Sequence, residues 1–192
     1  EDLSDISSSD GESGADEDNR RDAAFLAAVQ EDVMVTPFRA ELHLALISAL
    51  REAAQLDRLR RAREFAVCCI SLPEPQWLEW LEDEKRLDMD FDKFAQLSRL
   101  ACDSCPTSKI WLQRCALFRE RDGNASDVRR VYEEALEVLG AHPFEGPEIW
   151  ADYRDYEEAL LARTGGEAGQ VQCIRTLFLR QMSLLGSERL LE

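Results

Sequence analysis

The sequence predicts an all-helical fold, an α-α superhelix of about four antiparallel helix pairs. From residue 22 onward, apolar residues recur at helical spacing, and no stretch rich in Val, Ile and Thr is bracketed by hairpin turns. Every proline precedes an apolar helical stretch, where its missing N–H costs nothing. Three tryptophans follow such helix starts at similar intervals. Together these observations indicate a repeated helical hairpin.

Prolines and glycines divide the body of the chain, residues 23–192, because proline suits the start of a helix and glycine its end. The prolines are Pro37, Pro73, Pro75, Pro106, Pro143 and Pro147, and the glycines expected at helix ends are Gly123, Gly140, Gly165, Gly166 and Gly186. The predicted pairs are 38–54 with 56–70, 75–87 with 90–103, 107–121 with 125–140, and 147–163 with 167–185. They form four units, 38–70, 75–103, 107–140 and 147–185.

The start of three units is similar in sequence. PEPQWLEWLEDE, PTSKIWLQRCALF and GPEIWADYRDYE each place a proline before a tryptophan, at Trp77, Trp111 and Trp150. The intervals of 34 and 39 residues are typical of a solenoid, in which each unit buries its apolar face on its neighbours.

Two glutamates are expected to point into the core. Seven positions along a helix correspond to a rotation of about 700°, so Glu84 shares a face with Trp77, and Glu157 shares one with Trp150. A buried carboxylate needs hydrogen-bond or charge partners. The sequence therefore predicts a polar lock between helices, with partners among Arg129, Tyr132, Arg175 or a tryptophan N–H.

Residues 1–22 form an acidic tail with nine carboxylates against Arg20 and Arg21. Its two aliphatic residues offer too little apolar surface to offset chain entropy, so we expect disorder. Three serines have an acid three residues on and are candidates for phosphorylation, namely Ser7, Ser9 and Ser13. A tail that only improves solubility is the alternative.

The charge balance restricts the partners. The chain has a formal net charge of −16, so it repels phosphate and favours basic or amphipathic protein segments over direct contact with RNA or DNA. No run approaches the roughly 18 apolar residues of a membrane span, and a secretory signal is absent, so we expect an intracellular protein. The six cysteines are expected to be reduced.

Four other patterns in the sequence are candidate active or binding sites. Glu84 and Glu157 could form a catalytic carboxylate pair, but packing explains each of them, and no catalytic residue is assigned. The aromatic series could stack on RNA, but it lacks interleaved cations, so a core role is expected. Cys102 and Cys105 form a lone C-x-x-C pair, and the two histidines, His43 and His142, are distant in sequence. No phosphate-binding or nucleophile motif is present, so neither a cofactor nor a metal is expected.

These helices resemble the HAT (half-a-TPR) repeat family, whose first helix carries a Trp, an aromatic residue three positions later and a Glu seven later. Two units match fully, and the third keeps Trp111 but has Arg114 and Phe118 at the other positions. VRRVYEEAL and IRTLFLRQM resemble the second-helix pattern ARxxFERAL. The resemblance therefore assigns a structural motif to Trp77, Trp80, Glu84, Trp111, Trp150, Tyr153, Glu157, Arg129, Tyr132, Arg175 and Phe178.

HAT proteins are protein-binding scaffolds of RNA processing, and the order of tail and repeats is similar to the N-terminal HAT region of the U4/U6 snRNP recycling factors. The resemblance implies a nucleoplasmic, non-enzymatic scaffold of pre-mRNA splicing that binds snRNP or spliceosomal proteins. It also implies that this chain holds the first half of an array, that RNA binds to RNA recognition motifs outside it, and that the rest of the array could form a homodimer.

The sequence also fits two alternative functions. The chain could serve another RNA-processing complex, such as the spliceosome core or the 3′-end cleavage machinery. It could also be an acidic, chaperone-like binder of basic proteins. The binding surface has no motif of its own, and the acids Glu79 and Glu82 are its weak candidates.

Overall fold

A computed structural model describes residues 24, 26–120, 124–165 and 168–188 of the chain. All regular secondary structure in these residues is helical, which confirms the predicted all-helical fold. The predicted tail and its serines lie outside the described residues. None of the described helices is long and apolar enough to cross a membrane. The chain divides into two compact units, Glu1–Ser71 and Leu72–Glu192.

The first unit contains a helical segment at residues 26–35, followed by α2 (Ala40–Glu52) and α3 (Leu56–Cys69). α2 and α3 pack against each other as a hairpin. No predicted pair includes the segment 26–35. Its Leu26, Val29 and Val33 are buried, and their spacing of three and four residues places them on one face of a helix.

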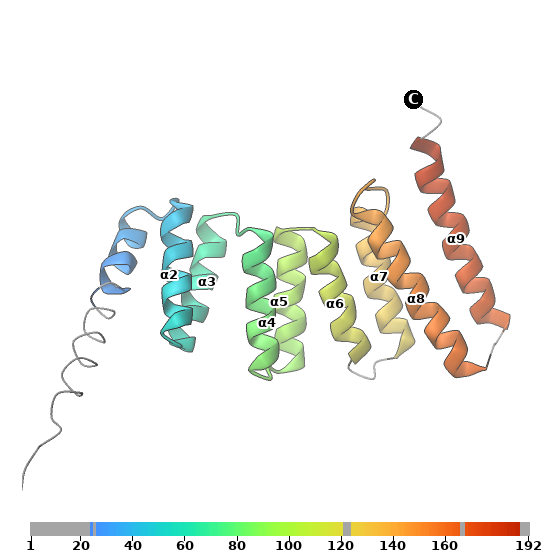
Figure 1. Ribbon diagram of the computed structural model, residues 1–192, viewed down its shortest axis with the longest axis horizontal. Coiled ribbons are helices and arrows are strands. Elements are labelled where there is room, and N and C mark those ends of the chain that lie inside the picture. Colours follow the sequence, from blue (N-terminus) through green and yellow to red (C-terminus); the bar gives the residue numbers. More distant parts are fainter. Residues whose placement is uncertain (1–23, 25, 121–123, 166–167, 189–192) are drawn as a thin grey trace, which may run out of the picture. The chain divides into compact units, whose positions relative to one another are not determined.

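The second unit contains three hairpins, α4 (Glu74–Arg86) with α5 (Phe91–Ser104), α6 (Ser108–Glu120) with α7 (Ala125–Leu139), and α8 (Gly146–Thr164) with α9 (Ala168–Glu188). The hairpins follow one another along this unit (Figure 1). α6 packs against α4 and α8, so these three first helices form one row. Among the described residues, α5 and α7 do not pack on each other, and both instead contact α6.

Local signals explain where several helices begin and end. Pro75 and Pro147 lie in the first turns of α4 and α8. The side chain of Asn124 caps α7 by accepting a hydrogen bond from the Ser126 amide at 3.2 Å. Gly165 ends α8 with a φ of 77°, a left-handed conformation that glycine adopts without strain. Gly186 lies in the last turn of α9, near its end at Glu188.

The turn after α4 adopts a left-handed conformation without a glycine. Asp88 has a φ of 51°, and the amides of Asp88 and Met89 donate to the carbonyls of Lys85 and Glu84 at 3.2 Å each. This is the bonding of a Schellman motif, in which glycine is the usual residue at the left-handed position.

Asp88→Gly should therefore stabilise the chain by about 1 kcal/mol, because glycine avoids the steric cost of the left-handed conformation. Urea unfolding followed by circular dichroism measures the change. Asp88→Ala is the control, since alanine keeps the strain and should give no gain. Equal stabilisation by both substitutions would show that the charge of Asp88, and not its backbone conformation, is responsible.

Candidate functional site

The aromatic residues of the predicted motif form the core of the second unit. Trp77, Trp80, Trp111, Trp150 and Tyr153 are all at most 4% exposed. The rings of Trp77 and Trp80 stack on each other with centroids 5.4 Å apart and planes 9° from parallel. These five rings are thus inaccessible to the bases of an RNA strand.

Phe178 departs from the prediction of a core role, since it is 45% exposed. The neighbouring Leu177 is buried instead, at 2% exposure. The ring of Phe178 lies 4.8 Å from the guanidinium carbon of Arg154 on α8, a cation–π contact. α9 therefore faces α8 one residue earlier than the sequence pattern indicates.

Glu157 on α8 connects three consecutive helices. Its side chain is fully buried, and the guanidinium of Arg129 on α7 donates to both carboxylate oxygens, at 2.7 and 3.0 Å. Gln170 on α9 also donates to Glu157 and accepts from Arg129 at 2.9 Å. Hydrogen bonding to Glu157 raises the pKa of Arg129 above its ordinary value. The pair is bidentate, the strongest geometry for these groups.

The other two candidate partners are not among the groups that bind Glu157. Arg175 is exposed on α9. The hydroxyl of Tyr132 donates to the carboxylate of Asp152 on α8. Burial, and then the hydrogen bond to Asp152, raises the pKa of the Tyr132 hydroxyl. The carboxylate of Asp152 also accepts a hydrogen bond from the guanidinium of Arg119 on α6, at 3.1 Å, so Asp152 joins α6, α7 and α8.

Glu84 occupies the corresponding position on α4 and is 1% exposed. The indole N–H of Trp80 donates to its carboxylate at 3.3 Å. α6 packs between α4 and α8, so Glu84 and Glu157 belong to helices that do not contact each other in the described chain. The two carboxylates are thus engaged separately, which supports packing roles for both.

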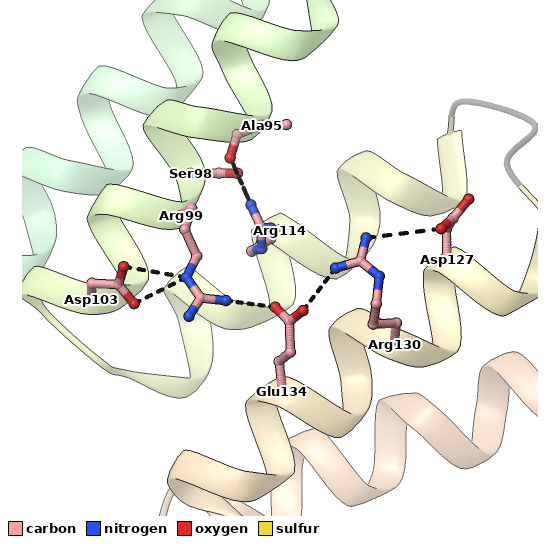
Figure 2. Close-up of polar contacts among 8 residues, drawn as sticks. All are labelled: Ala95, Ser98, Arg99, Asp103, Arg114, Asp127, Arg130 and Glu134. Atoms are coloured by element: carbon pink, nitrogen blue, oxygen red, sulfur yellow. Dashed lines mark hydrogen bonds and ion pairs between the residues drawn. The ribbon is translucent and has the colours of Figure 1, made fainter.

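Arg114, which replaces the aromatic residue of the motif in α6, makes a different contact. It is 6% exposed, and its guanidinium donates to the Ala95 carbonyl and the Ser98 hydroxyl of α5, at 2.7 and 2.8 Å (Figure 2). Its Nε is buried without a hydrogen-bond acceptor, and no carboxylate lies within ion-pair distance among the described residues. Burial lowers the pKa of Arg114. A buried cation held by neutral acceptors carries a desolvation cost.

Arg114→Met should leave the free energy of unfolding unchanged or raise it by about 1–2 kcal/mol, because the desolvation cost disappears. The two acceptors keep a bond, since the Ser98 hydroxyl donates to the Ala95 carbonyl at 2.9 Å. Arg119→Met on the same helix is the control and should destabilise by about 1–2 kcal/mol, because Asp152 loses its cation. Chemical denaturation compares the two, and a greater loss for Arg114→Met would contradict this account.

Figure 2 shows a chain of alternating charges that links α5 to α7. The carboxylate of Glu134 accepts from Arg99 and from Arg130, at 2.7 Å each. Asp103 lies 3.1 Å from Arg99, and Asp127 lies 3.8 Å from Arg130. Glu134 is half-buried and the other four side chains are exposed, so each pair contributes about 1 kcal/mol or less. They connect two helices that do not pack on each other among the described residues.

Similar polar pairs join equivalent positions of successive hairpins. Lys85 on α4 contacts Glu120 on α6, and Lys109 on α6 contacts Glu74 on α4, at 2.9 Å each. Both pairs, and that of Arg99 with Glu134, are separated by 35 residues. That separation, close to the tryptophan interval, is the signal in the sequence that could have identified these pairs.

The cysteines and histidines singled out in the sequence have surroundings that packing explains. Cys102 is buried, which raises the pKa of its thiol to about 12, and burial also raises the pKa of Cys105. Both thiols are therefore protonated at neutral pH, which disfavours metal binding and nucleophilic attack. The described residues include no group of three or more metal-ligating side chains. His43 is packed in the core with Nε2 2.7 Å from the Pro37 carbonyl, and His142 lies in the loop before α8.

The two acids proposed for the binding surface differ. Glu79 is half-buried and already has an interaction within the protein. Glu82 is exposed, and its carboxylate pairs with Arg86 at 3.1 Å on the same helix. Neither acid is distinguished from the rest of the surface by its geometry.

Known proteins resemble this chain over most of its length. No protein-family profile matches it. It is 32% identical over 164 residues to spliceosome associated factor 3, U4/U6 recycling protein, of Mus musculus, and 29% identical over 162 residues to the protein of that name from Homo sapiens. Each alignment covers 81% of this chain and 16% of the relative. The Danio rerio protein is 29% identical over 180 residues, which cover 84% and 19%. The chain is thus similar to less than a fifth of these U4/U6 recycling proteins.

Proposed function

We propose that this chain is a protein-binding scaffold that takes part in the recycling of the U4/U6 snRNP during pre-mRNA splicing. The observation that carries the proposal is the 32% identity over 164 residues to the mouse U4/U6 recycling protein. The similarity extends over 81% of the chain, which favours a shared helical framework over a single shared motif. With this role we expect the protein to act in the nucleus, and specifically in the nucleoplasm.

We also infer that the hairpins are HAT repeats. The Trp, aromatic and Glu pattern occurs in α4 and α8, and its residues are buried in both helices. The bidentate contact between Arg129 and Glu157 gives a physical reason for the motif, because it joins the second helix of one hairpin to the first helix of the next. On this basis the four units would be 38–70, 75–103, 107–140 and 147–185.

Binding rather than catalysis fits the chemistry of the described residues. The buried acids Glu84 and Glu157 are bonded within the helical framework, and the buried thiols are protonated. The net charge of −16 favours snRNP or spliceosomal proteins with basic or amphipathic segments. RNA would then be bound by RNA recognition motifs outside this chain, and dimerisation would use the rest of the array.

Affinity capture from nuclear extract, with quantitative mass spectrometry, tests the proposed function. We expect the immobilised chain to enrich U4/U6 snRNP proteins over an unrelated acidic helical protein of the same charge. Enrichment of cleavage-factor proteins instead would favour the alternative RNA-processing complex. If no snRNP protein were enriched, the proposed function would be wrong.

A variant with a neutral tail separates specific binding by the helices from capture by the acidic tail. In the full chain, the acidic residues of 1–22 are replaced by Asn and Gln, so that the tail loses its negative charge. We expect this variant to retain its snRNP partners, because binding depends on the helical body. Loss of every partner would support the chaperone-like alternative, in which the tail holds basic proteins through screened charge attraction.

A further inference from the structure

The connection between α7 and α8, which joins two hairpins, is longer than the preceding connection of this kind, between α5 and α6. Residues 140–145 form it, whereas residues 105–107 suffice between α5 and α6. The longer connection contains Phe144, which at 83% is the most exposed large apolar side chain of the described residues. Val138, in the last turn of α7, is 54% exposed, and Pro143 is also exposed. The ring of Phe144 makes an edge contact with His142 of the same loop, at 6.3 Å between centroids, and most of its surface is open to a partner protein.

The loop that presents Phe144 is held in place by its own hydrogen bonds. The His142 amide donates to the Leu139 carbonyl, and the Gly146 amide to the His142 carbonyl, at 2.9 Å each. The Glu145 amide donates to Nδ1 of His142 at 3.1 Å. The indole N–H of Trp150, from the core, donates to the Gly140 carbonyl at 2.9 Å. The loop is therefore ordered before any partner arrives, which reduces the entropy cost of binding.

Contacts with the preceding hairpin fix the loop from its other side. One carboxylate oxygen of Glu145 accepts from the Ser108 amide at 2.7 Å, and Glu148 accepts from the Ser108 hydroxyl at 2.7 Å. Gly146 has no room for a side chain, because a Cβ would lie 2.7 Å from the Leu139 carbonyl oxygen. The fold thus specifies the position of the loop closely while it leaves the Phe144 ring in solvent.

The charges around the loop select the kind of partner. Residues 131–153 contain six acidic residues and no Lys or Arg, but Glu133, Glu134 and Asp152 are already paired with arginines outside this stretch. Lys109 of α6, which acts on Glu145 and Glu148, is itself paired with Glu74. Glu137 is exposed near the end of α7, and Glu145 and Glu148 form no ion pair among the described residues. The negative charge of Glu137, Glu145 and Glu148 repels a nucleic acid strand, whereas it complements a protein surface with basic residues.

We propose that the α7–α8 loop is a docking site, in which Phe144 inserts into an apolar socket of a partner protein whose rim carries Lys or Arg. The inference rests on the proposed function only in that the chain binds proteins. Buried aromatic anchors surrounded by polar contacts are the usual centres of protein interfaces. The surrounding glutamates would steer the basic rim toward the loop.

Site-specific photo-crosslinking tests the proposal directly. Benzoylphenylalanine replaces Phe144 in the full chain, and the protein is irradiated in nuclear extract. We expect a cross-link to a partner peptide that combines apolar residues with Lys or Arg. The control is the same replacement at Phe38, which is 80% exposed but is followed by Arg39. Cross-links to RNA, to a second copy of the chain, or to the same peptides from both positions would overturn the proposal.

The affinity of the chain for the purified partner measures how much Phe144 contributes to binding. Phe144→Ser should weaken binding at least about tenfold, because the complex loses the ring that the partner's socket would bury. Phe38→Ser should change the affinity less than about twofold. Glu137→Gln should weaken binding less and reduce its dependence on salt. Both phenylalanine variants should melt at the wild-type temperature, since each side chain is exposed. Unchanged affinity of Phe144→Ser would overturn the proposal.

The two proposals fail in different ways. If the chain captures snRNP proteins and the Phe144→Ser variant captures them equally, the proposed function stands and the docking site is wrong. If Phe144 cross-links to an apolar, basic-rimmed surface of a protein unrelated to splicing, the docking site stands and the proposed function is wrong.

Discussion

Glu157→Gln is expected to lower the free energy of unfolding by about 2–4 kcal/mol, because it breaks a buried ion pair by removing one charge. Glutamine nearly preserves the size of the side chain, so packing changes little. A neutral glutamine has no charge to attract Arg129, and it has one oxygen in place of the two that accept from Arg129. Its amide NH2 group would also face the NH2 group of Gln170, which donates to Glu157. Three consecutive helices lose their common contact.

Urea unfolding followed by circular dichroism at 222 nm measures this change. The control is Glu158→Gln, the same substitution at the next residue of α8, which is exposed. It should change the free energy of unfolding by less than about 0.5 kcal/mol. If the two variants unfold at the same urea concentration, Glu157 is not a lock between helices.

Trp150→Phe is expected to destabilise the chain by about 2–3 kcal/mol, which is more than the same substitution at Trp111. Both side chains are at most 1% exposed, so both variants lose buried volume. Only Trp150 donates its indole N–H to a carbonyl, that of Gly140, and the buried Gly140 would lose this partner. The indole N–H of Trp111 is buried without an acceptor. Its removal therefore relieves an unsatisfied donor.

The comparison of the two variants isolates the hydrogen bond from the change in volume. Trp111→Phe should cost about 1 kcal/mol, so the difference between the variants should be about 1–2 kcal/mol. Thermal and urea unfolding, followed by circular dichroism, give both values. A greater loss for Trp111→Phe would mean that cavity size, and not the bond to Gly140, decides the stability.

The helical fold was predictable because its signals are local. Proline at the first turns of α4 and α8, and the helical spacing of apolar residues, depend on a few neighbouring positions. The burial of Glu84 and Glu157 also follows from the geometry of a single helix. The assignment of Phe178 to the core was wrong, because the face that α9 turns toward α8 depends on packing between helices.

Contacts between hairpins were less accessible to sequence reasoning. Asp152 gathers Arg119 and Tyr132 from two other helices, and no motif marks it. Arg114 departs from the aromatic pattern, yet it is buried through bonds to α5 that depend on Ser98. The exposed position of Phe144 follows from a loop conformation fixed by Ser108, more than thirty residues earlier. Such contacts combine distant positions, and a single sequence records only their separation.

The two rows of helices in the second unit are joined by interactions of different physical kinds. The row of α4, α6 and α8 has direct packing, which short-range apolar contacts maintain at any salt concentration. α5 and α7 do not pack on each other in the described chain and are linked by the ion pairs of Glu134 with Arg99 and Arg130, which added salt screens. We therefore expect the unit to bend mainly by separating α5 from α7, so that ionic strength tunes its curvature while its core stays intact.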